Sequence, residues 1–224
     1  MQPDLVIFDC DGVLVDSELI AMHVMLDAIA AKTGLKIDAR EAYDKFLGKS
    51  LATILKILEK SYHLVLPETA LEDMRVDLFD HFRAELKPVP HIVEALDHLD
   101  MPICVASSSH LERIRLSLEI TGLRSRFEPN IFSASMVRRG KPAPDLFLYA
   151  AHAMGADPKN CVVIEDSQAG IEAAHEACMQ AFAFSGGAHA DIAQLKARYE
   201  YLGPAFTFDD MRQLPHLLRG APGE

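Results

Sequence analysis

The sequence lacks the features that mark nucleic-acid-binding and membrane proteins. Acidic residues outnumber basic ones by 33 to 22, which gives a formal net charge of −11. This surplus argues against a nucleic-acid or anionic-membrane surface, since both need basic patches. No stretch is apolar over the length of a membrane span, and the opening MQPD has neither the basic start nor the long apolar run of a signal peptide. We therefore expect a cytoplasmic protein with no nucleic-acid or membrane partner.

Cysteine is also sparse. Cys10, Cys104, Cys161 and Cys178 form no C-x-x-C pair and no zinc-binding spacing. The first three lie in or beside apolar runs, which is typical of buried thiols. We therefore expect reduced cysteines rather than a disulfide framework.

Apolar material is plentiful, because half of the residues are hydrophobic. Continuous apolar runs of four to eight residues suit the central strands of a parallel sheet. Three such runs, each ending in polar residues, occupy residues 5–9, 102–109 and 161–167, and weaker candidates occupy 130–134 and 180–184. Helical patterns lie between them at residues 111–121, 144–154 and 168–178. The alternation predicts an α/β fold built on a doubly wound, mostly parallel sheet.

One region breaks this alternation. From Glu18 to about Leu86 the sequence reads as consecutive amphipathic helices with no convincing strand between them, at residues 18–33, 39–46, 51–62 and 67–86. We predict that residues 17–86 form a helical domain inserted after the first strand. Residues 1–16 and 87–224 then form the α/β core.

Polar side chains follow the three strong runs at the point where each run ends. They are Asp9 and Asp11, then residues 107–109, all serine, then Glu165 and Asp166. Ligands of open parallel sheets bind at the carboxyl ends of the strands, so we expect these side chains to share one crevice. Neighbouring carboxylates repel one another unless a cation or protonation relieves them. Oxygen ligands without histidine or cysteine favour Mg²⁺ over zinc.

This combination suits phosphoryl transfer. A carboxylate beside a divalent cation can attack phosphorus and form an aspartyl-phosphate. A second carboxyl two residues further on can protonate the leaving oxygen and then activate water. The reaction also needs positive charge around the phosphoryl oxygens, and Lys141, in a loop before a predicted helix, is a candidate.

Four motifs resemble, in order and rough spacing, those of the haloacid dehalogenase-like hydrolases. Within that family the resemblance is to the group of β-phosphoglucomutase and small sugar-phosphate phosphatases. The motifs are DCDGVLVDSE at residues 9–18, VASSS at 105–109, KPAPD at 141–145 and IEDSQAGIEAA at 164–174. The resemblance covers nearly the whole chain, and it identifies the inserted helices as a cap domain.

The resemblance implies a role for each residue of the motifs. Asp9 would be the nucleophile and Asp11 the general acid and base. Ser107 would hold the transferred phosphoryl group, Ser108 would contact the substrate, and Lys141 would neutralise the nucleophile and the phosphate.

The resemblance also implies a Mg²⁺ site. Asp166 would bind the ion together with the Asp9 carboxylate and the backbone carbonyl of Asp11. Glu165 would be a direct or water-mediated partner of the same ion.

The segment FLGKS, at residues 46–50, resembles the cap loop that closes over the substrate in this family. We expect Lys49 or Ser50 to contact the non-phosphate end of the substrate, and an ordinary surface loop is the alternative. Its GKS ending does not form a nucleotide-binding loop, because Tyr43 stands where that motif needs glycine.

The sequence therefore predicts a Mg²⁺-dependent phosphatase that acts, as a monomer or weak homo-oligomer, on a small phosphate ester such as a sugar or sugar-acid phosphate. A phosphomutase is the first alternative. The mutase pattern has a histidine where Ala21 stands and a cap arginine where Leu51 stands, and both are absent here. A metal-independent dehalogenase and a non-catalytic binding protein on the same fold are further alternatives, against which the full set of carboxylates argues.

Overall fold

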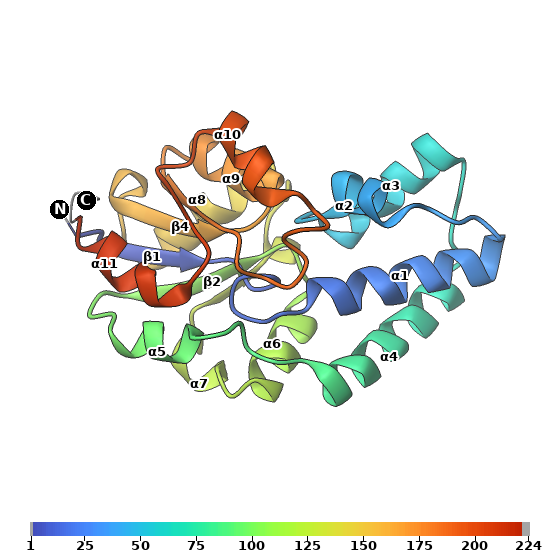
Figure 1. Cartoon of the computed structure of the whole chain (residues 1–224), viewed down its shortest axis with the longest axis horizontal. Helices are drawn as coiled ribbons and strands as arrows, with labels where there is room; N and C mark the ends of the chain where they lie inside the picture. Colours follow the sequence, from blue (N-terminus) through green and yellow to red (C-terminus); the bar gives the residue numbers. More distant parts are fainter. Residues whose placement is uncertain (1, 221–224) are drawn as a thin grey trace.

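A computed structural model of the chain, which describes residues 2–220, contains a six-stranded sheet whose strands all run parallel (Figure 1). The strand order is β3-β2-β1-β4-β5-β6. The strands are β1 (Leu5–Phe8), β2 (Ile103–Ser107), β3 (Ile131–Ser133), β4 (Cys161–Glu165), β5 (Gln180–Phe184) and β6 (Phe206–Phe208). The winding of the chain reverses at β1: strands β2 and β3 follow on one side of it, and strands β4, β5 and β6 on the other. A crevice for a ligand is expected at such a switch point.

Strand β1 explains why the sheet is covered on both faces. All four of its residues are buried, and they alternate between two hydrophobic clusters. Leu5 and Ile7 pack with α8 (Asp145–Ala153) and α9 (Gln168–Glu176) on one face. Val6 and Phe8 pack with the helices of the other face, namely α5 (Ile92–Asp97), α6 (Leu111–Ile120), α7 (Arg124–Phe127) and α11 (Leu214–Leu218). A strand buried on both faces reads as a continuous apolar run, as it does here.

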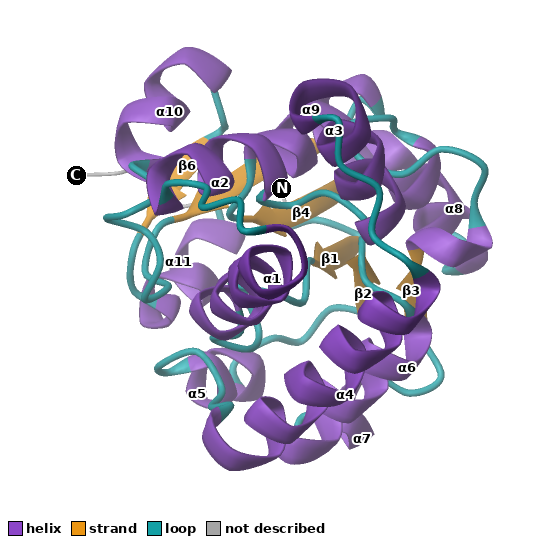
Figure 2. Ribbon diagram, turned by 90° about the vertical axis from the view of Figure 1, so that its right-hand side faces the viewer, coloured by secondary structure: helices purple, strands orange, loops and turns teal. Residues whose placement is uncertain are grey.

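Five helices lie between β1 and β2 along the chain. The first four are α1 (Glu18–Thr33), α2 (Ala39–Phe46), α3 (Leu51–Tyr62) and α4 (Glu68–Glu85), and α5 follows them. Figure 2 looks at the molecule from their side and shows them in front of the strand ends. Local sequence starts two of these helices, since Asp38 accepts hydrogen bonds from the first N–H groups of α2 and Ser50 does so for α3. The predicted helices at residues 18–33, 39–46 and 51–62 match these bounds, and the division into core and cap domains stays a prediction.

The doubly wound parallel α/β fold is confirmed, and several short elements were not predicted. They are α5, α7, α10 (Leu195–Leu202), α11 and β6. Strand β6 has three residues, two of them exposed, and lies at the edge of the sheet. It is therefore too short to show the continuous apolar run that predicts a buried strand. All four cysteines are free thiols, and only Cys178 is exposed. In the part of the chain that the structure describes, no helix is both long and apolar enough to cross a bilayer.

Candidate active site

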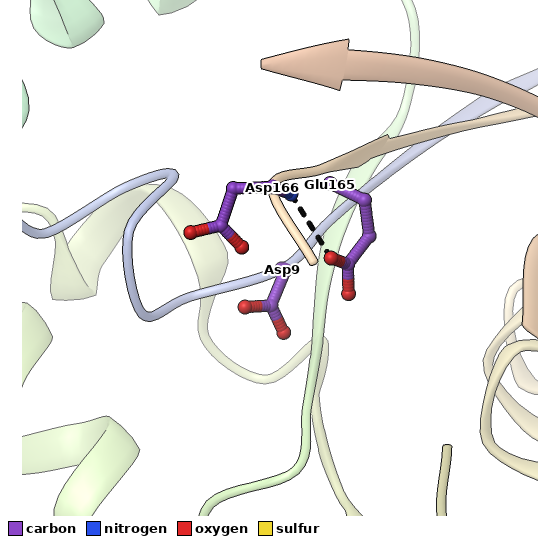
Figure 3. A group of neighbouring side chains, drawn as sticks. All are labelled: Asp9, Glu165 and Asp166. Atoms are coloured by element: carbon purple, nitrogen blue, oxygen red, sulfur yellow. Dashed lines mark hydrogen bonds between the residues drawn. The ribbon is translucent and has the colours of Figure 1, made fainter. Parts of the chain in front are cut away.

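The sheet brings the polar ends of three strands to one edge. Phe8, the last residue of β1, is paired with Val105 of β2 on one side and with Ile164 of β4 on the other. The Asp9 N–H continues the ladder by donating to the Ile164 carbonyl at 2.9 Å. Asp9 therefore enters the crevice beside the residues that end β4, and Figure 3 shows its carboxylate grouped with those of Glu165 and Asp166.

Lys141 connects two of these carboxylates. Its Nζ lies 2.6 Å from Asp9 Oδ1 and 2.5 Å from Glu165 Oε1, and it also lies 4.7 Å from the ring centroid of Phe147. The residue is only 2% exposed. Burial alone disfavours the ammonium, but the charges of Asp9 and Glu165 outweigh it and raise the pKa of Lys141. The lysine is therefore a fixed positive charge at the end of β1.

Both carboxylate oxygens of Glu165 are engaged. Oε1 accepts from Lys141, while Oε2 accepts from the N–H groups of Asp166 and Ser167 at 3.0 and 2.8 Å and from Ser167 Oγ at 2.9 Å. The helix that follows needs Gly170 at this point, because a Cβ there would lie 1.8 Å from Glu165 Oε1. Glu165 thus orients Lys141 and the β4–α9 turn, and its contact with a metal ion stays a prediction.

The donor set fits a hard divalent cation. Asp9, Glu165 and Asp166 each offer an oxygen, and these oxygens lie within 4.8 Å of one another. Asp166 Oδ2 is buried without a hydrogen bond among the described residues, and Gly12 leaves room for it, since a Cβ there would lie 1.9 Å away. All the donors are oxygen, as Mg²⁺ prefers. The carboxylate of Asp11 is hydrogen-bonded to other side chains, so the predicted contact of Asp11 with the metal ion would come from its backbone carbonyl.

The pKa values of two of these carboxyl groups are shifted upward. Burial raises the pKa of Asp9 well above its usual value; Lys141 opposes this, and the neighbouring carboxylates add to it. Burial also raises the pKa of Asp166, and the charge of Glu165 raises it further. A cation between them would favour the ionised form of both groups.

Asp11 lies in a different environment, among hydrogen-bond donors. Its carboxylate accepts from Ser17 Oγ at 2.6 Å, Ser109 Oγ at 2.7 Å and Arg113 Nη2 at 2.7 Å. Burial is the largest single influence on the pKa of Asp11 and acts upward. The Arg113 charge and the three hydrogen bonds together outweigh it, so that the pKa is lowered.

Sequence reasoning missed Arg113 and Glu18. Arg113 lies in the first turn of α6, just after the serine run, and its guanidinium also lies 5.3 Å from the ring of Phe82. A basic residue one turn after the serine motif was the available signal. Glu18 begins α1 and lines the cavity described below; burial, with the charges of Asp11 and Asp166, raises its pKa to about 8.

The predicted cap loop lies against the core. Ser108 Oγ donates to the Gly48 carbonyl at 2.9 Å, which joins the serine run to this loop. Ser107 Oγ accepts from the Ser109 N–H at 3.1 Å. Ser50 is engaged in capping α3, where its Oγ accepts from the Thr53 N–H at 3.3 Å.

A cavity of about 700 Å³ opens between helices α1 and α4, the cap loop and the serine run. This size is in the range of small-molecule sites. Its wall is largely apolar, with Met22, Met25, Phe46, Leu51 and Met74 among its residues. Ser108 and Ser109 lie at the core end. The charged residues that line the cavity are Glu18, Lys49, Glu68, Glu72, Arg75, Glu112 and Arg113. The cavity therefore connects the cap to the strand ends.

Known proteins share this sequence and this architecture. The family model for haloacid dehalogenase-like hydrolases matches residues 3–177. The chain is 30% identical over 216 residues to 6-phosphogluconate phosphatase of Escherichia coli, covering 96% of this chain and 94% of that protein.

Two solved structures are similar over almost their whole length. A haloacid dehalogenase-like protein of unknown function from Agrobacterium tumefaciens is 33% identical, with a TM-score of 0.78 over 97% of this chain and 98% of that one. A HAD family hydrolase from Deinococcus radiodurans, solved with bound phosphate and sodium, is 31% identical, with a TM-score of 0.74 over 98% and 96% of the two chains.

Proposed function

The chain belongs to the haloacid dehalogenase-like hydrolases, and we propose that it is a Mg²⁺-dependent phosphatase of a small sugar or sugar-acid phosphate, acting through an aspartyl-phosphate on Asp9. Its class, a phosphoric monoester hydrolase, is that of its phosphatase relatives. The observation that carries the proposal is the position of Lys141 Nζ between Asp9 and Glu165, at the strand end where Asp9, Glu165 and Asp166 bring carboxylate oxygens within 4.8 Å of one another.

The first half-reaction transfers the phosphoryl group to Asp9. A carboxylate oxygen of Asp9 forms a bond to phosphorus while the bond between phosphorus and the ester oxygen breaks. Lys141 favours the ionised form of Asp9 and places positive charge beside the phosphoryl oxygens. Asp9 and Asp166 would hold the Mg²⁺, which supplies further positive charge to the same oxygens.

Asp11 moves the protons in both half-reactions. A phosphate ester arriving in the crevice adds negative charge, which raises the pKa of Asp11 and allows it to protonate the leaving oxygen. Asp11, ionised again, then takes a proton from a water molecule as the water oxygen attacks phosphorus. This step releases inorganic phosphate and restores the Asp9 carboxylate.

Lys49 supports an acidic substrate. Its half-buried ammonium lines the cavity, and among residues 2–220 no carboxylate lies within ion-pair distance of it. Desolvation lowers the pKa of Lys49, and the charge of Glu172 opposes this shift without cancelling it. A sugar-acid carboxylate bound there would supply an ion-pair partner.

The cavity wall also favours the phosphatase over the mutase. Ala21 and Leu51, which stand where the mutase pattern has its histidine and arginine, both line the cavity. Neither offers a donor for the second phosphate group that a phosphomutase has to hold.

We test the proposal by measuring phosphate release from 6-phosphogluconate and neutral sugar phosphates, with Mg²⁺ and with EDTA. We expect turnover only with Mg²⁺, and a loss on the order of 10³-fold or more in Asp9→Asn, since the nucleophile is removed. Asp100→Asn, a change to an exposed aspartate, is the control and should keep full activity.

Three results would contradict the proposal. Substantial turnover by purified Asp9→Asn would overturn the nucleophile, and activity that survives EDTA would favour the dehalogenase. Conversion of β-glucose 1-phosphate to the 6-phosphate would favour the mutase.

A further inference from the structure

A histidine that the mechanism does not use lies against the predicted metal site. His189 is in the loop between β5 and α10, in the segment SGGAHA, and is fully buried. Its Nε2 lies 2.9 Å from Asp166 Oδ2. Neither ring nitrogen, nor Asp166 Oδ2, has a hydrogen bond within the described part of the chain. The two groups are therefore as close as hydrogen-bonded atoms, but their angles are not those of a hydrogen bond.

The surroundings are shaped for this pair. A Cβ on Gly12 would lie 1.9 Å from Asp166 Oδ2 and 2.9 Å from His189 Cε1, and a Cβ on Gly187 would lie 2.8 Å from the same His189 carbon. Two glycines from separate loops therefore make room for the imidazole and the carboxylate together. On the cap side, the ring of Tyr43 stacks on His189 with centroids 6.1 Å apart and planes 21° from parallel.

Packing alone does not account for an imidazole at this position. A buried polar ring without hydrogen bonds costs free energy that an apolar side chain of similar shape would not. The imidazole has one nearby partner of opposite character, the carboxylate oxygen of Asp166, and that oxygen is also unsatisfied. Carboxylates that bind metal ions are commonly held by a second hydrogen bond from outside the coordination sphere.

We propose that His189 is a positioning residue for the divalent cation, whose Nε2–H donates to Asp166 Oδ2 and leaves the other carboxylate oxygen of Asp166 to face the ion. The inference rests on the proposed metal role of Asp166. His189 contacts neither substrate nor ion, and acts only by fixing the orientation of Asp166. The ring of Tyr43, from the predicted cap, stacks on the imidazole of His189 and limits its rotation.

The test is Mg²⁺ affinity, measured by titration calorimetry on the full chain without substrate. His189→Leu removes the donor and should weaken Mg²⁺ binding about 10- to 100-fold, whereas His189→Gln keeps an N–H donor and should recover most of the affinity. His175→Leu, at an exposed position of α9, is the control and should bind Mg²⁺ as the unmodified protein does.

Asp166→Asn, measured in parallel, separates this inference from the proposed function. If Asp166→Asn binds Mg²⁺ normally, the metal site itself is wrong. If Asp166→Asn binds weakly but a folded His189→Leu binds normally, only the positioning role is overturned. Should His189→Leu not fold, the Gln variant decides: a loss of affinity as large as that of Asp166→Asn would rule out a role based on hydrogen-bond donation.

Discussion

At the scale of single residues, the two aspartates of the first motif have opposite environments although they are two positions apart. Burial raises the pKa of Asp9, the charge of Lys141 opposes this, and the neighbouring carboxylates add to it. Asp11 is held by Arg113, Ser17 and Ser109, and its pKa is lowered. Two titratable groups whose pKa values are pushed apart are a common basis for separate catalytic roles. Here the division depends on Arg113, which the motif does not contain.

Replacing Arg113 by methionine should therefore change how the rate depends on pH. Loss of the guanidinium removes the charge that lowers the pKa of Asp11, so that pKa rises. Because kcat/KM reports the first half-reaction, in which Asp11 acts as the acid, we expect its basic limb to move to higher pH by about one to two units. The readout is the position of that limb, since the overall rate can fall for reasons of binding alone.

The matched control is Arg115→Met on the same helix, where the arginine pairs with Glu128 at 2.8 Å, outside the cavity. Its basic limb should stay in place. An unchanged limb in Arg113→Met would mean that Asp11 does not control the profile.

At the scale of elements, the loop between α2 and α3 lies against the polar turns at the strand ends. Gly48 adopts a φ of 72°, and a Cβ there would lie 2.1 Å from Ser167 Oγ. Its carbonyl accepts from Ser108, as described above. The loop therefore rests on the turns after both β2 and β4, and this placement puts Lys49 in the cavity wall.

Lys49→Met should reduce selectivity for an acidic substrate. Because a charge-assisted contact is typically worth about 1.5–3 kcal/mol, we expect KM for 6-phosphogluconate to rise roughly 10-fold or more. KM for glucose 6-phosphate should change much less, and kcat should be kept for both. Lys56→Met, on the exposed face of α3, is the control. An equal rise in KM for both substrates would place Lys49 on the phosphoryl group and contradict its role in selectivity.

The sequence predicts the helices and strands that have a clear hydrophobic pattern, and the polar residues at the ends of the strands. Strands β1, β2 and β4 are apolar runs followed by functional side chains, so both the sheet and the cluster at its edge could be predicted. Lys141 could be named only from its context, namely the need for positive charge and then the family resemblance, because a lone lysine in a loop is ordinarily at the surface.

His189 and Arg113 could not be predicted from local pattern. His189 lies in a glycine-containing loop that reads as a plain turn, and only the tertiary fold brings it to Asp166. Arg113 sits in an amphipathic helix where a charged residue normally faces solvent. The position of His189 carries no signal that separates it from an ordinary loop residue, and the only signal for Arg113 is its place one turn after the serine motif.

At the scale of the whole molecule, the active site places uncompensated negative charge in the interior. Asp9, Glu165 and Asp166 are buried, and Lys141 is the buried cation they share. The raised pKa values of Asp9 and Asp166 mean that their ionisation disfavours the folded state. The stability that these two groups contribute is thus present in acid and is lost as the pH rises through their folded-state pKa values.

Asp166→Asn should therefore be more stable than the unmodified protein in EDTA, with a difference in Tm that grows as the pH rises. We expect a gap of a few degrees, because 1 kcal/mol corresponds to roughly 2–4 °C in a chain of this size. Mg²⁺ should raise the Tm of the unmodified protein and close the gap, but leave the variant unchanged. Thermal scans at several pH values, with Asp100→Asn as control, provide the measurement. A variant that is less stable in EDTA at every pH would contradict this account.

The central position of β1 also determines when the protein becomes an enzyme during its synthesis. Leu5–Phe8 is translated early, but its neighbours in the sheet are Ile103–Ser107 and Cys161–Glu165. An apolar strand thus leaves the ribosome about a hundred residues before its first partner, while helices α1–α4, whose contacts are more local, can form in the interval. Asp9 meets Lys141 and Asp166 only after β4 has been made. A nascent or truncated chain that ends before β4 carries Asp9 but lacks Glu165 and Asp166, so we expect it not to turn over a phosphate ester.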